Sequence, residues 1–119
     1  MKNLGAFRTT LEINETIAGR LTLSQRVHAL QIAREAVSNA VRHGEATHVQ
    51  IHLRMAGEFA EFEVRDNGRG FEVSAPAPRG KGLQNFVDRA RELGGELAIE
   101  SKPGHGATVK LTFSLHHHA

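Results

Sequence analysis

The chain has 119 residues, of which 39% are apolar and 24% charged, and this composition fits one globular domain and excludes an intrinsically disordered protein. The net charge of +2, with scattered basic residues, does not predict a nucleic-acid-binding protein, and no apolar stretch reaches the roughly 20 residues of a membrane span. The absence of cysteine excludes disulfides and thiolate sites and fits a reducing compartment.

Hydrophobic periodicity predicts two helices and five strands. Loose alternation predicts a first strand over residues 7–13, and residues 17–21 are expected to be a connection. The first helix is expected to begin at a cap formed by Thr22 or Ser24 and to end near His43, just before a glycine.

The rest of the chain predicts a hairpin, a loop, a helix and two further strands. The hairpin pairs antiparallel strands, and we expect the loop to be disordered or variable without a ligand. Together these elements predict an α+β fold, a two-layer α/β sandwich with the helices on one face of a mixed, mostly antiparallel sheet. One domain is expected over residues 1–115, and the histidine-rich residues 116–119 are interpreted as a tag remnant. The predicted ranges are strands over 48–55 and 59–66, the loop over 72–82, a helix over 83–93, and strands over 96–101 and 107–113.

Asp66 ends the second hairpin strand and is followed by Asn67, Gly68, Arg69 and Gly70. Every second residue before Asp66 is apolar, so its carboxylate is expected to point toward the core side. A carboxylate in that position needs hydrogen-bond donors, and the glycines allow a ligand to approach closely. The pattern suits a ligand with an exocyclic amine, such as adenine. An ordinary turn, in which Asp66 and Asn67 only cap the backbone, is the alternative.

The helix over 22–43 carries a second pattern. Glu35, Asn39 and His43 are spaced by four residues and form a line along one border of its apolar side. Carboxylate and amide oxygens are suitable ligands for Mg²⁺, which is typically also coordinated by phosphate oxygens. A solvated helix border with ordinary polar pairing explains the same spacing. The apolar side expected to face the core comprises Leu30, Ile32, Ala33, Ala36, Val37, Ala40 and Val41.

A third pattern is the segment Arg79-Gly80-Lys81-Gly82-Leu83, which precedes the second predicted helix. Backbone N–H groups at a helix N-terminus bind phosphate, and the two cations add charge. The segment matches neither a Walker motif nor a Rossmann fingerprint. A flexible loop closed by a helix cap is the alternative.

The order and spacing of these three patterns resemble the ATP-binding domain shared by histidine kinases, gyrase, the Hsp90 chaperones and the MutL repair proteins, which is called the Bergerat fold. Residues 33–43 resemble its N box, residues 66–70 its G1 box and residues 80–83 its G2 box. The sequence is most similar to kinases that pair with helix-turn-helix response regulators, the group containing the nitrate/nitrite sensors. Gly82-Leu83-Gln84-Asn85 and Leu93-Gly94-Gly95 support that likeness.

The resemblance implies a role for each matching residue. Asp66 would accept a hydrogen bond from the adenine amine, Asn39 would ligate a Mg²⁺ ion that bridges the phosphates of ATP, and Glu35 would be the catalytic residue beside the γ-phosphate. The family often has Thr where this chain has Ala107, so adenine recognition would depend more on Asp66 and on water. The other implied cofactor-binding residues are Gly68 and Gly70 beside the base, and His43, Gly80, Lys81, Gly82 and Leu83 around the phosphates.

The resemblance also implies a function, the ATP-binding catalytic domain of a two-component sensor histidine kinase. Such a protein-histidine kinase domain is inactive alone, because the phosphoacceptor histidine lies on a separate dimerising helical domain of the same kinase, and a response regulator acts downstream. It implies a cytoplasmic, monomeric domain without nucleic-acid or direct membrane contact, and leaves open whether the parent is an inner-membrane sensor. An anti-sigma-factor-type serine kinase and a non-enzymatic ATP-binding regulatory module remain alternatives, whereas the length argues against a gyrase-type clamp.

Overall fold

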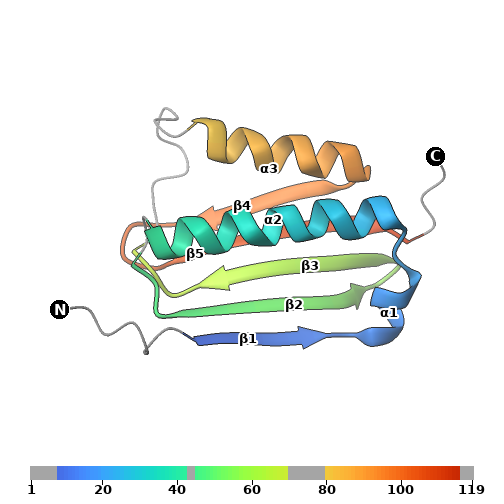
Figure 1. Cartoon of the computed structure of the whole chain (residues 1–119), viewed down its shortest axis with the longest axis horizontal. Coiled ribbons are helices and arrows are strands. Elements are labelled where there is room, and N and C mark those ends of the chain that lie inside the picture. Colours follow the sequence, from blue (N-terminus) through green and yellow to red (C-terminus); the bar gives the residue numbers. More distant parts are fainter. Residues whose placement is uncertain (1–7, 43–44, 70–79, 116–119) are drawn as a thin grey trace.

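The computed structural model describes residues 8–42, 45–69 and 80–115, with only the backbone described for 80–85. Within this part, the chain forms five strands and three helices (Figure 1). None of these helices is both long and apolar enough to cross a bilayer. In chain order, the strands and helices are β1 (Arg8–Ile13), α1 (Glu15–Arg20), α2 (Leu23–Arg42), β2 (His48–Ala56), β3 (Phe59–Asp66), α3 (Gly80–Leu93), β4 (Glu96–Ser101) and β5 (Ala107–Ser114).

The strands form one mixed sheet in the order β1-β2-β3-β5-β4. β1 runs parallel to β2, and the other neighbouring pairs are antiparallel. α2 packs on β2 and β3, and α3 packs on α2 and β4, so both long helices cover the same face of the sheet (Figure 1). The predicted two-layer sandwich is therefore confirmed.

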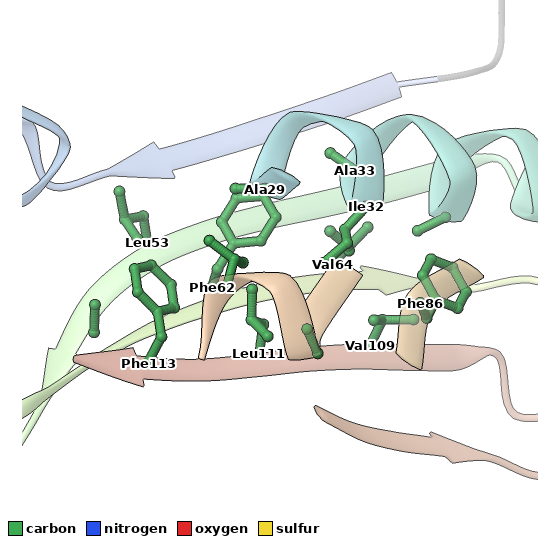
Figure 2. Packing of buried hydrophobic residues seen from close by; sticks show 14 of the residues in the cluster. Ala29, Ile32, Ala33, Leu53, Phe62, Val64, Phe86, Val109, Leu111 and Phe113 are labelled. Atoms are coloured by element: carbon green, nitrogen blue, oxygen red, sulfur yellow. The ribbon is translucent and has the colours of Figure 1, made fainter. Parts of the chain in front are cut away.

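The hydrophobic core fills the space between α2, α3 and the sheet (Figure 2). The small alanines of α2 allow the helix to approach the sheet closely, while Ile32 and the three phenylalanines Phe62, Phe86 and Phe113 fill the remaining volume. The inward rows expected from strand alternation are buried, namely Ala60, Phe62 and Val64 on β3 and Val109, Leu111 and Phe113 on β5.

The N-terminal end of α2 is fixed by a capping box. Thr22 is the cap, because its Oγ1 accepts from the N–H of Gln25 at 3.0 Å and the Oε1 of Gln25 accepts from the N–H of Thr22 at 2.9 Å. The Nε2 of the buried Gln25 also donates to the carbonyl of Ser114 at 3.0 Å. The start of α2 is thereby tied to the end of β5.

Two predicted boundaries are wrong. The expected connection over 17–21 falls largely within α1, which begins after Asn14, whose Oδ1 accepts from the N–H of Ile17 at 3.1 Å. α3 begins at Gly80 rather than Leu83, so residues 80–82 form its first turn instead of the end of a loop. Glycine is a poor helix former, but it is tolerated in the first turn of a helix whose later residues pack well.

The predicted core-facing side of α2 is too wide. Leu30 is 61% exposed and Val41 is 48% exposed, whereas Ile32, Ala36 and Ala40 are buried as expected. The sheet covers only one narrow side of the helix, which leaves the outer apolar residues in contact with solvent.

Candidate functional site

The C-terminal end of α2, the start of β2, the end of β3 and the start of α3 lie at the same end of the molecule, on the left in Figure 1. The strand register gives the same result, because Asp66 at the end of β3 pairs with Val49 near the start of β2 and with Ala107 at the start of β5. The fold thus brings residues of the predicted N and G1 boxes to one edge.

Asp66 is partly buried and continues the inward-facing row of β3. Its Oδ1 accepts from the backbone N–H of Gly68 at 2.7 Å, and the backbone N–H of Ala107 also donates to the carboxylate. Burial raises the pKa of Asp66 above its ordinary value of 3.8, although the two N–H donors act in the opposite direction. The carboxylate is thus oriented by the backbone, and two occupied acceptor positions leave others for a ligand.

Asn67 joins the end of β3 to the segment between α2 and β2. Its Oδ1 accepts from the N–H groups of Thr47 and His48 at 3.0 and 2.9 Å, and its Nδ2 donates to the Oγ1 of Thr47 at 3.0 Å. The N–H of Ala46 in turn donates to the carbonyl of Ala40 at 2.9 Å. A continuous set of hydrogen bonds therefore connects the helix end next to Asn39 with the turn after Asp66.

Gly106 supports the same turn from β5. Its φ is 75°, and a Cβ at this position would collide with the backbone carbonyl oxygen of Asp66. The Oγ of Ser101 donates to the carbonyl of Gly106 at 2.8 Å, and the N–H of Gly104 donates to the carbonyl of Arg69. The turn between β4 and β5 thus packs directly on the backbone that presents Asp66.

Glu35 and Asn39 are partly buried on the side of α2 that faces α3. The orientation follows from His28, seven residues before Glu35 and therefore on nearly the same side, whose Nδ1 lies 3.3 Å from Nη1 of Arg89 on α3. Neither Glu35 nor Asn39 has a side-chain hydrogen bond or ion pair to another described residue. Both polar groups are free to contact a ligand held between the two helices.

The remaining predicted site residues divide into three groups. Gly68 lies beside Asp66, as expected, and donates its N–H to that carboxylate. His43 and Gly70, like residues 72–79 of the predicted loop and the terminal residues 116–119, lie outside the described residues. For Gly80, Lys81, Gly82 and Leu83 the structure gives only a helical backbone in the first turn of α3.

Residues 24–117 match the family described as histidine kinase-, DNA gyrase B-, and HSP90-like ATPase. The chain belongs to this family. The resemblance to the ATP-binding domain of histidine kinases is thereby confirmed, and membership in this ATPase family implies that the domain binds ATP.

Individual relatives agree with the family assignment. The sensor protein VraS of Staphylococcus saprophyticus is 36% identical over 84 residues, which are 71% of this chain but 24% of that protein. The ATP-binding domain of PrrB from Mycobacterium tuberculosis is 28% identical, with a TM-score of 0.63 over 74% of this chain and 67% of that one. A histidine kinase domain from Erythrobacter litoralis EL346 shares the fold, with a TM-score of 0.68, 24% identity, and coverage of 93% of this chain and 52% of that one.

The raised pKa of Asp66 predicts a pH dependence for this ATPase-family domain. If Asp66 accepts a hydrogen bond from the adenine amine, as the resemblance implies, ATP affinity should be full above the pKa of Asp66 and should fall as the pH falls through it, because only the ionised carboxylate offers all its acceptor positions. Because that pKa is raised, the decline should begin at a higher pH than for an ordinary aspartate. Isothermal titration calorimetry between neutral and mildly acidic pH measures this profile.

Asp66→Asn is the control for that profile. The variant should bind ATP more weakly by about 1–3 kcal/mol at neutral pH, because the amide has an NH₂ donor in place of one carboxylate oxygen and that donor cannot accept from the adenine amine. Its profile should retain only the titration of the nucleotide itself. Parallel pH profiles for the wild-type chain and the variant would contradict the assignment of Asp66 to the adenine amine.

Proposed function

We propose that this chain is the catalytic domain of a two-component sensor histidine kinase, which supplies the phosphoryl group of Mg-ATP to a histidine on a separate dimerising helical domain. The observation that supports it most is the sequence match to sensor kinases together with an oriented, partly buried Asp66 at the expected end of β3. The chain spans about a quarter of the length of the sensor proteins that it matches, 24% for VraS. The acceptor domain would lie in the remainder.

Asp66 and Glu35 would have different tasks in this function. Asp66 would select adenine through its amine, and Gly68 would keep the backbone close to the base. Glu35, on the α3-facing side of α2, would orient the acceptor histidine or take its proton. Phosphoryl transfer requires little covalent participation by the protein, because positioning of the acceptor in line and neutralisation of charge supply most of the rate.

Asn39 would ligate the Mg²⁺ ion. Among the described residues, no three His, Cys, Asp or Glu side chains gather into a group that could hold a metal ion. Mg²⁺ commonly uses one or two protein oxygens and completes its shell with waters and nucleotide phosphates, and the partly buried amide of Asn39 fits that use. His43, Gly70, Gly80, Lys81, Gly82 and Leu83 remain proposed nucleotide contacts on sequence grounds.

Asn39→Ala tests the metal assignment. We expect ATP affinity to fall about tenfold in the presence of Mg²⁺, equivalent to about 1.4 kcal/mol, and to change little when Mg²⁺ is removed with a chelator. Calorimetry with and without Mg²⁺ gives both values. Ser38→Ala, one residue away on the same helix, is the matched control and should change neither. An equal loss with and without Mg²⁺ would indicate a packing defect in α2 instead.

Sequence details support a narrower assignment within the sensor kinases. Gly82-Leu83-Gln84-Asn85 and Leu93-Gly94-Gly95 resemble the nitrate/nitrite-sensor group, and we propose that the chain belongs there. The partners would then be a response regulator downstream and the helical acceptor domain of the same kinase, with the catalytic domain itself cytoplasmic and monomeric. The similarity to sensor proteins favours a histidine over a serine acceptor.

The test of the proposed function is a transfer assay. Incubated with labelled ATP and Mg²⁺, the isolated chain should remain unlabelled, and addition of the helical domain that carries the phosphoacceptor histidine should give acid-labile label on that domain. Stoichiometric acid-labile phosphate on the isolated chain, for example on His28, would contradict this division of roles. Acid-stable label on a partner serine would favour a serine kinase.

A further inference from the structure

The outer side of α2 carries an exposed row of residues with a regular spacing. The intervals along the row are 4, 3, 4, 3 and 4, the heptad spacing of a coiled-coil seam. The core-facing residues of α2 lie on another side of the helix, and of the row only the partly buried Val37 packs against the core described above. The row consists of Leu23 (77% exposed), Val27 (44%), Leu30 (61%), the exposed Arg34, the partly buried Val37, and Val41 (48%).

The position of this heptad row separates it from the nucleotide side of α2. His28, Glu35 and Asn39 lie toward α3, whereas the row lies on the flank toward β1. In Figure 1, α3 lies along the first flank, and in the described part of the chain only the short α1 accompanies the second. Leu11 on β1 is also 62% exposed. A helix placed along the row would therefore leave the α3 side open to ATP.

An exposed apolar row of this length favours a helical occupant. Helices with apolar residues at alternating intervals of three and four pack side by side with a small crossing angle, each side chain inserting between four of the partner. A sheet edge or an extended peptide would not match this spacing. The row is longer than the single exposed residues that ordinary surfaces carry.

Arg34 defines the chemistry of the occupant more closely. It stands in the middle of the row, and it forms no ion pair or hydrogen bond with the residues that the structure describes. A cation at a seam position is favourable when an acidic side chain of the partner helix lies opposite, and it then fixes the register of the pair. The expected occupant is an amphipathic helix with an apolar 3-4 row interrupted by one Asp or Glu.

We infer that the heptad row of α2 docks a helix of the phosphoacceptor domain. This inference rests on the proposed function, and it names the surface by which the acceptor is held. The 84 matched residues make up only 24% of the sensor protein VraS, so a helical segment of the same polypeptide would be available at high effective concentration. Docking on α2 would position the acceptor relative to Glu35 and Asn39, because these residues belong to the same helix.

Binding of the isolated phosphoacceptor hairpin to this chain, measured by calorimetry without nucleotide, tests the inference. Leu30→Ser and Arg34→Glu should each weaken binding at least tenfold. Phe59→Ser, at a 49% exposed position in the β2–β3 turn region, and Lys102→Glu, between β4 and β5, are the matched controls and should bind as the wild-type chain does. All four changed residues are exposed, so the variants should keep the thermal midpoint and the ATP affinity of the wild-type chain.

A charge exchange provides the sharper readout. Reversal of the acid on the hairpin to Lys should restore the affinity that Arg34→Glu removes, and a double-mutant cycle measures their coupling. The inference would be overturned if both row variants bound the hairpin with wild-type affinity. It would also be overturned if the wild-type chain self-associated and the row variants did not, because the row would then bind a second copy of this chain. Because this test uses no nucleotide, its failure leaves ATP binding and phosphoryl transfer to be judged by their own assays.

Discussion

Glu35→Gln is expected to lower the rate of phosphoryl transfer to the acceptor histidine by about 10²–10⁴-fold, the usual contribution of a positioned acid or base. The change keeps the size of a partly buried side chain and removes only its charge and its ability to take a proton. ATP affinity should remain close to that of the wild-type chain, since Glu35 is not assigned to the base or the metal. Single-turnover labelling of the helical acceptor domain measures the rate.

The control for this experiment is Glu58→Gln, an identical change at an exposed turn position, which should leave the rate unaltered. A fall in ATP affinity as large as the fall in rate would show that Glu35 contributes to binding rather than to transfer. An unchanged rate would remove Glu35 from the catalytic role.

Gly106→Ala is expected to give the largest loss of stability among single methyl additions in the turn between β4 and β5. The new Cβ would meet the carbonyl oxygen of Asp66, and an alanine at a φ of 75° is strained in addition. Together these effects should lower the free energy of unfolding by about 2–4 kcal/mol. Urea unfolding followed by circular dichroism measures the loss.

Gly104→Ala separates the two causes. Gly104 also has a positive φ, of 84°, but a Cβ there meets no atom within 4 Å. The free energy of unfolding of Gly104→Ala should therefore fall only by the cost of backbone strain, about 1 kcal/mol. If the free energy of unfolding fell equally in both variants, the close approach of Gly106 to Asp66 would not contribute to the loss. Any folded Gly106→Ala protein should also bind ATP more weakly, because the backbone that orients Asp66 must move.

The sheet and the long helix could be predicted because their signals are local. Strict alternation placed β2, β3 and β5 to within a residue or two, and the apolar period placed α2. α1 was missed because its six residues are too few to show a period, although Asn14 is a residue type that is favoured at helix N-caps. Leu30 and Val41 were assigned to the core because apolar character alone does not distinguish a core side from a docking surface.

The residues of the candidate site could likewise be predicted only where their signals are local. Asp66 and Gly68 were predictable, since strand direction and glycine position are local properties. The connections of Asn67 were not, because Thr47 and His48 lie 20 and 19 residues away in the sequence and become neighbours only through the hairpin. The contact of Gly106 with the backbone of Asp66 likewise depends on the pairing of β3 with β5.

The anchoring of α2 at both ends has a consequence for the energetics of ligand binding. The contact of Gln25 with Ser114 fixes one end, and the connections through Ala46 and Asn67 fix the other. The rotational freedom of this helix relative to β3 is thus lost when the chain folds, and nucleotide binding need not restrict it again. Preorganisation of this kind favours affinity through a smaller entropic penalty. Cutting the Asn67 connection with Asn67→Ala should therefore appear in calorimetry mainly as a less favourable binding entropy.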